Sequence, residues 1–81
     1  MDDRPIHQHI EDLSDEEERL YAAAGEGGGL SAPDRERLTA IKVELDQCFD
    51  LLHQREARRA AGLDPDAAEV RPADIVERYQ Q

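Results

Sequence analysis

The sequence predicts an all-α fold, an antiparallel two-helix hairpin with a short C-terminal helix, in one domain spanning residues 1–81. Three observations support this prediction. Apolar residues recur every three or four positions through two long segments, the strict alternation typical of strands is absent, and the stretch GEGGG separates the two segments. Because each helix carries only a narrow apolar stripe, we expect two hairpins to pair into a four-helix bundle dimer.

The first helix is predicted for residues 4–24. Its stripe steps by four and three residues and is interrupted only by Glu17; the apolar members are Ile6, Ile10, Leu13, Leu20 and Ala24. Pro5 suits the first turn, where its missing amide hydrogen costs nothing. The glycines that follow disfavour a helix, so a loop is predicted for residues 25–31. A phosphate-binding loop is excluded, because no strand precedes these glycines and no Gly-Lys-Ser/Thr follows them.

The second helix is predicted for residues 32–61. Ser31 can cap it, and Pro33 lies in the first turn, where proline is tolerated. Gly62 followed by an apolar residue indicates its C-terminal end. Residues 62–81 are predicted to form a turn and a short helix, which would be marginal in isolation and needs a surface on which to dock.

The apolar stripes of both helices define a predicted packing seam. Its members are Ile6, Ile10, Leu13, Leu20, Leu38, Ile41, Leu45, Cys48, Phe49 and Leu52. Because the first helix is shorter, it should cover the second only to about residue 50. The remaining turns would overhang and present Arg55, Arg58 and Arg59 as a possible contact for a partner, either a second subunit or another protein.

The net charge of −10 excludes several classes of partner. Nucleic-acid binding depends on neutralising phosphates, so a chain with this acidic balance is not expected to bind nucleic acid. Anionic membrane surfaces would repel it, and no segment has the length and apolarity of a spanning helix. A single cysteine cannot form an internal disulfide and suits a reducing compartment, so we expect a cytoplasmic protein.

The residues with chemical potential gather in the stretch ELDQCFDLLHQR, at positions 44–55. Cys48 lies in the seam, where a free cysteine behaves as a small hydrophobe. Asp46, Asp50 and His53 share one side of the helix and form the alternative hypothesis, a metal-binding bundle. No nucleophile, base and orienting group can be assembled, so we expect no enzyme activity and no cofactor.

Several stretches together resemble a known family: IHQHIEDLSDEEERL, the glycine-containing loop, RLTAIKVELDQCFDLLHQR, the GLDPD turn and VRPADIVERY. They resemble the domain-of-unknown-function 2630 family of short, mostly actinobacterial proteins, over nearly the full chain. The resemblance implies a helical fold and no established activity. It also implies that Trp and Arg are more common at the positions of Phe49 and His53, and a guanidinium would not replace a metal ligand.

The function that the sequence predicts best is a self-associating protein-interaction or regulatory module without catalysis. Two alternatives remain open. One is the metal-binding bundle of Asp46, Asp50 and His53. The other is a segment that uses its arginines to grip an acidic or phosphorylated protein partner.

Overall fold

The chain forms two long helices and a short third one, with no strand among the residues that the structure describes. The computed structural model describes residues 2–79 and the side chains of residues 2–78. In chain order the elements are α1 (Arg4–Gly27), α2 (Ala32–Ala60), the 3-10 turn η1 (Pro65–Ala67) and α3 (Ala73–Tyr79). The all-α prediction is confirmed for this part of the chain; residues 80 and 81, included in the predicted C-terminal segment, lie outside it.

Helix α1 extends beyond its predicted end at residue 24. It continues to Gly27, and the chain leaves the helix at Gly28, whose φ is +83°. The amide of Gly29 then donates to the carbonyl of Ala24, at 3.0 Å. Glycine disfavours a helix by about 1 kcal/mol relative to alanine but leaves its hydrogen bonds intact, so the helix stops only where a left-handed residue turns the chain.

Helix α2 has the termini expected from its capping residues. The Ser31 hydroxyl accepts a hydrogen bond from the amide of Asp34, at 3.2 Å. At the other end, Gly62 has a φ of +75°, and the amide of Leu63 donates to the carbonyl of Arg58, at 2.7 Å. These bonds satisfy helix-terminal groups that would otherwise have no partner.

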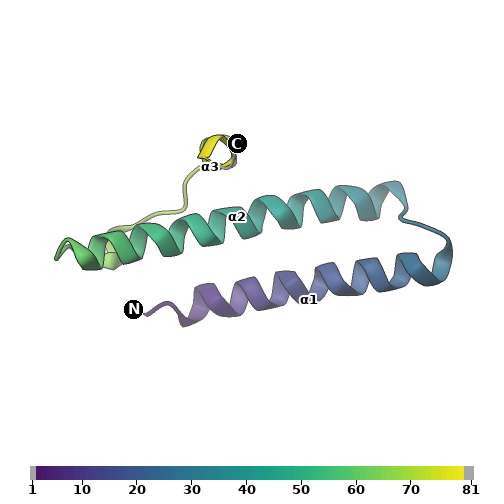
Figure 1. Cartoon of the computed structure of the whole chain (residues 1–81), viewed down its shortest axis with the longest axis horizontal. Helices are drawn as coiled ribbons and strands as arrows, with labels where there is room; N and C mark the ends of the chain where they lie inside the picture. Colours follow the sequence, from purple (N-terminus) through teal and green to yellow (C-terminus); the bar gives the residue numbers. More distant parts are fainter. Residues whose placement is uncertain (1, 80–81) are drawn as a thin grey trace.

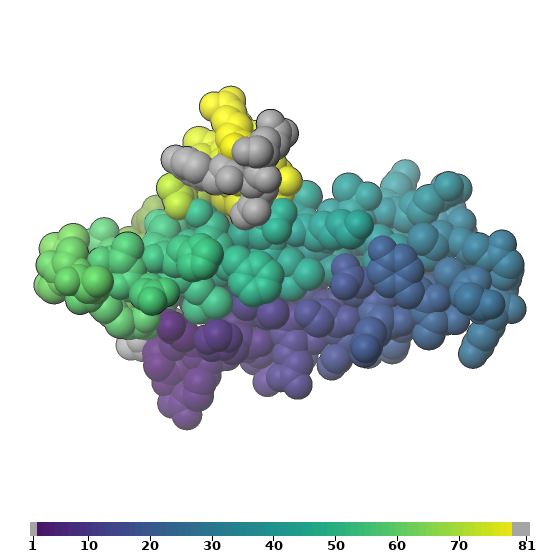
Figure 2. All heavy atoms as spheres, in the orientation of Figure 1, coloured from purple at the N-terminus to yellow at the C-terminus, as the bar shows by residue number. Residues whose placement is uncertain are grey.

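The two long helices run antiparallel as a single layer, and α3 lies on α2 on the side away from α1 (Figure 1). The Cα positions span 52 × 25 × 15 Å, so the molecule is about twice as long as it is wide. Figure 2 shows the resulting elongated body, with the C-terminal segment standing out from one edge.

The buried apolar core of the described residues is small. It consists of Leu13, Leu38, Ile41 and Val76. Most other positions of the seam predicted from the sequence are half-buried, and Phe49 keeps 43% of its surface exposed. A single layer of helices has no second layer above its apolar stripe, so most of the seam stays partly in contact with water.

Candidate functional site

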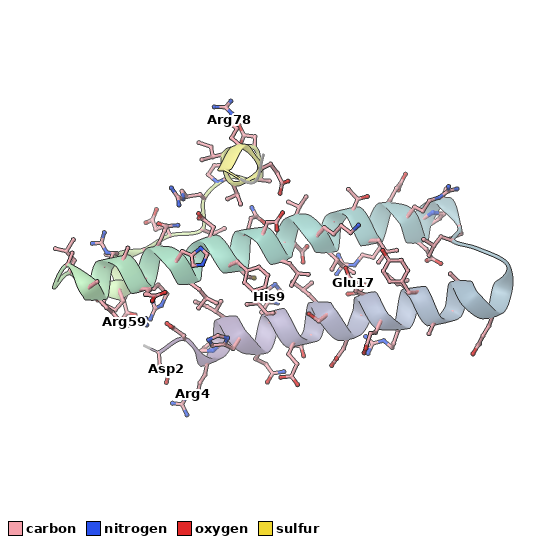
Figure 3. The ribbon with its side chains drawn as sticks, in the orientation of Figure 1. Asp2, Arg4, His9, Glu17, Arg59 and Arg78 are labelled. Carbon is pink, nitrogen blue, oxygen red and sulfur yellow. The ribbon has the colours of Figure 1, made fainter. Side chains whose placement is uncertain are left out.

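An apolar groove of about 300 Å³ opens where the start of α1, the middle of α2 and the C-terminal segment meet. Helix α1 contributes Pro5, Ile6 and His9, α2 contributes Glu44, Gln47, Cys48 and Leu51, and the stretch before α3 contributes Val70. His9 lies between the two long helices (Figure 3). The groove remains open because α3 packs on α2 without reaching α1. Its volume is at the lower end of the range for small-molecule pockets.

Cys48 lies in this groove and is half-buried. Burial raises the pKa of its thiol, and the nearby carboxylate of Glu44 raises it further. A thiol is nucleophilic only as the thiolate, so this environment opposes reactivity. Cys48 therefore contributes apolar surface to the groove.

Asp46, Asp50 and His53 do not converge on a common point. The carboxylate of Asp50 accepts hydrogen bonds from Nε of Arg71 at 2.8 Å and from Nε2 of Gln54 at 2.9 Å. Arg71 is the main cause, and Gln54 a smaller one, of an Asp50 pKa below its ordinary value of 3.8. His53 is exposed, and within residues 2–78 no group of three or more His, Cys, Asp or Glu side chains is arranged to hold a metal ion.

The arginines near the end of α2 bind groups of the same chain. Arg55 is only 4% exposed. Its Nε donates to Oδ1 of Asp3 at 2.6 Å, and its Nη1 donates to Oδ1 of Asp66 at 3.0 Å and to the carbonyl of Pro65 at 3.1 Å. Arg59 also donates to Asp3. We call Asp3, Arg55, Arg59 and Asp66 the Arg55 cluster.

The Arg55 cluster shows that the end of α2 is not the uncovered overhang that was expected from the helix lengths. Asp3, just before α1, reaches both Arg55 and Arg59, so the start of the chain covers α2 beyond residue 50. Arg58 is engaged as well, because its Nε donates to the carbonyl of Asp64 at 2.7 Å. In this conformation the three arginines tie the N-terminus and η1 to α2, and their guanidinium groups already have partners within the chain.

No sequence pattern pointed to Asp3 or Asp66 as partners of Arg55. Asp3 occupies the N-cap position of α1, where an aspartate usually accepts a hydrogen bond from the helix that it begins. Here its side chain makes no such bond and binds two arginines instead. The missing cap bond is visible only in the folded chain.

Asp3 makes the stability of the chain depend on pH. Hydrogen bonds from Arg59 and then Arg55 lower its pKa from 3.8 to about 2. A carboxyl group with a lowered pKa stabilises the fold fully above pH 3.8, and this contribution is lost as the pH falls through about 2. We therefore expect Asp3→Asn to lower the urea midpoint at neutral pH, with a difference from the parent chain that shrinks as acid protonates Asp3. Asp15→Asn, at an exposed position of α1, is the control; an Asp3→Asn deficit that persists unchanged in strong acid would contradict the assignment.

Within residues 2–79, no helix is long and apolar enough to cross a membrane. The family comparison agrees with the resemblance found in the sequence. Uncharacterized proteins of Mycobacterium bovis and of two Mycobacterium tuberculosis strains are each 51% identical to this chain over 71 residues, covering 88% of the chain and 82% of the relative. No solved structure matches the chain. A family model described as a protein of unknown function, DUF2630, matches residues 2–81, and the chain belongs to that family.

Proposed function

We propose that this chain is a small protein-interaction module without catalysis, and that it self-associates by burying the apolar groove against a second copy. The observation that supports this proposal best is the side-by-side arrangement of α1 and α2 (Figure 1), with an open apolar groove between them that α3 does not close. Stable domains usually pack two layers around one core. A second copy would supply the missing layer and form a four-helix bundle.

Exposed apolar side chains of the groove and of α2 support the same proposal. Val70, on the rim, is 60% exposed, and Phe49, next to Cys48 on α2, is 43% exposed. Small domains with thin cores commonly gain apolar burial by oligomerising. A two-fold dimer would bury these groups on both copies at once.

Electrostatics sets a condition on this dimer. Each copy carries a net charge of −10, and Arg55 and Arg59 already bind Asp3 within their own chain. Two copies therefore repel each other at long range, and salt screens that repulsion. The homodimer should tighten as ionic strength rises, whereas binding to a basic partner would weaken.

The environments of the polar groups support a role without catalysis. The groove holds Cys48 as a thiol of raised pKa, and Asp50 is bound by Arg71 and Gln54. The single cysteine of the chain suits a reducing compartment, which supports a cytoplasmic location.

A charge introduced into the groove tests the proposal. Val70→Glu places a carboxylate on the rim at a position that is mostly exposed, so the monomer fold should be unaffected. We expect light scattering after size exclusion to show a dimer for the parent chain, more so at high ionic strength, and a monomer for Val70→Glu. The matched control is Leu63→Glu, which adds the same charge at a residue that is 54% exposed and lies outside the groove.

Two results would contradict the dimer. One is a parent chain that stays monomeric at every concentration and ionic strength tested. The other is equal loss of association in Val70→Glu and Leu63→Glu, which would mean that added charge acts generally and that the groove has no special part.

A further inference from the structure

The C-terminal segment is attached to α2 at several points. Gln54 Nε2 donates to the carbonyl of Glu69 at 2.9 Å, and Gln47 Nε2 donates to the carbonyl of Arg71 at 3.2 Å. Arg71 binds the carboxylate of Asp50 with two of its nitrogens. Beyond Arg71, the segment forms α3, which contacts α2 but not α1. Val76 is its apolar anchor, with 1% of its surface exposed.

One polar atom at the interface between α2 and α3 has no ordinary partner. The Oε1 atom of Glu77 is buried, and no hydrogen-bond donor of the described residues reaches it. The group that the Glu77 carboxyl contacts is another carboxyl, that of Asp46 on α2. Two ionised carboxylates repel each other because both are negatively charged, and they cannot form a hydrogen bond because both are acceptors. If one of them carries a proton, it donates a hydrogen bond to the other.

We propose that α3 is a proton-dependent latch, which is held on α2 when Glu77 carries a proton that it donates to the Asp46 carboxylate and is released when Glu77 ionises. The carboxyl pair lies beside the one fully buried anchor of the helix, Val76, so repulsion between the carboxylates acts directly on the docked geometry. An isolated helix of seven residues is not stable in water, and undocking would therefore also unwind α3.

None of the ion pairs found among the described residues joins a cation to Asp46 or Glu77. Arg78, the residue after Glu77, points away from α2 (Figure 3). Lys42, one turn before Asp46, forms no ion pair with either carboxyl group in the described part of the chain. Asp50, one turn after Asp46, is already bound by Arg71, and Asp74 on α3 adds a further negative charge. In this proposal, a proton on Glu77 removes the repulsion between the two carboxyl groups.

The sign of the pH dependence follows from the two carboxyl groups that hold the segment. Contact with Asp46, then burial, raises the pKa of Glu77 above 4.5, so docking is strongest below that value and weakens as the pH rises through the raised pKa. Asp50 acts in the opposite sense: Arg71 lowers its pKa from 3.8, and its contribution is lost in stronger acid. The segment should therefore dock most tightly between pH 3.8 and 4.5.

Methyl NMR signals of Val76 in the full chain report docking directly, because this side chain leaves a buried site when α3 is released. We expect the docked population to fall as the pH rises from mildly acidic to mildly alkaline. Ionisation of Glu77 should weaken docking about tenfold for each unit by which the pKa of Glu77 is higher in the docked state than in the undocked state. Glu77→Gln should abolish this dependence, because an amide can donate a hydrogen bond to the Asp46 carboxylate at any pH.

Matched variants separate the latch from general charge effects. Asp74→Asn removes one charge from the same helix at an exposed position and should keep the parent pH profile, whereas Asp46→Asn should lose it like Glu77→Gln. Measurements at two protein concentrations separate α3 release from self-association.

Two outcomes would overturn the proposal. Val76 signals that do not change with pH in the parent chain, or that change equally in Glu77→Gln, would mean that the carboxyl pair does not control docking. Docking at alkaline pH that requires Mg²⁺ or Mn²⁺ and is abolished by EDTA would mean that the pair holds a divalent cation in place of a proton.

Discussion

Ile41→Ala should lower the free energy of unfolding by about 2–5 kcal/mol, the range measured for buried isoleucine and leucine truncated to alanine. Ile41 is completely buried, and only three other apolar side chains of the described residues are classed with it as buried. A chain of this length is expected to be stable by only about 4–12 kcal/mol in total. The substitution would therefore remove a large part of the stability.

Urea unfolding followed by circular dichroism measures this effect. Ile41→Val, which removes one methylene group, should cost about 0.5–1.5 kcal/mol, and Leu63→Ala, at an exposed position, should cost less than about 0.5 kcal/mol. An Ile41→Ala cost as small as that of Leu63→Ala would mean that the packing between α1 and α2 is not where the structure places it.

The helices could be predicted from the sequence because their causes are local. The three-four spacing of apolar residues, the Ser31 cap and the Gly62 turn each depend on neighbours within a few positions. The same spacing includes Leu13 and Ile41, which the structure buries. The end of α1 was harder to place, because a glycine in the last turn disfavours the helix only slightly and the left-handed turn comes later, at Gly28.

The ionic contacts could not be predicted, because the sequence offers too many equivalent pairings. Twenty acids and ten bases allow many combinations, and simple charge attraction does not choose among them. Arg37 illustrates this. It could pair with Glu17, which interrupts the stripe of α1, but it binds Glu16 at 2.6 Å instead. The choice depends on how α1 is rotated against α2, a tertiary property that local periodicity leaves undetermined.

The placement of the C-terminal segment also depends on tertiary packing, which local periodicity does not determine. The sequence predicted a short helix that needs a docking surface, and it did not identify that surface. In the structure α2 supplies it, through Val76 and the contacts of Arg71. The contact between Asp46 and Glu77 is a consequence of this docking, and no residue pattern in either helix predicts it.

Arg55→Ala should destabilise the chain more than any other single arginine substitution. Arg55 is the least exposed charged residue among those described, and it joins three segments: Asp3 before α1, α2 itself, and η1 through Asp66 and the Pro65 carbonyl. Removing the guanidinium breaks these three hydrogen bonds at a side chain that is itself almost fully buried, and Arg59 alone then holds Asp3 to α2. We expect a decrease of several degrees in the melting temperature, together with faster amide exchange in the first turn of α1 and in η1.

Arg55→Lys and Arg35→Ala make the interpretation specific. A lysine keeps the charge but lacks the planar fork that serves Asp3, Asp66 and a carbonyl together, so Arg55→Lys should recover only part of the loss. Arg35→Ala removes an exposed arginine at the start of the same helix and should leave the melting temperature nearly unchanged. Equal effects of Arg55→Ala and Arg35→Ala would mean that the lost positive charge, and not the contacts of Arg55, determines the result.

A double-mutant cycle with Asp3→Asn shows whether Arg55 acts through the N-terminus. If the hydrogen bond between Arg55 and Asp3 carries the effect, the two substitutions together should destabilise the chain less than the sum of their separate effects at neutral pH. The loss of stability caused by Arg55→Ala should also be smaller in acid, because protonated Asp3 no longer forms an ion pair with either arginine. Strict additivity at neutral pH would instead assign the role of Arg55 to its contacts with η1. The start of α1 would then lie beside α2 without being held there by Arg55.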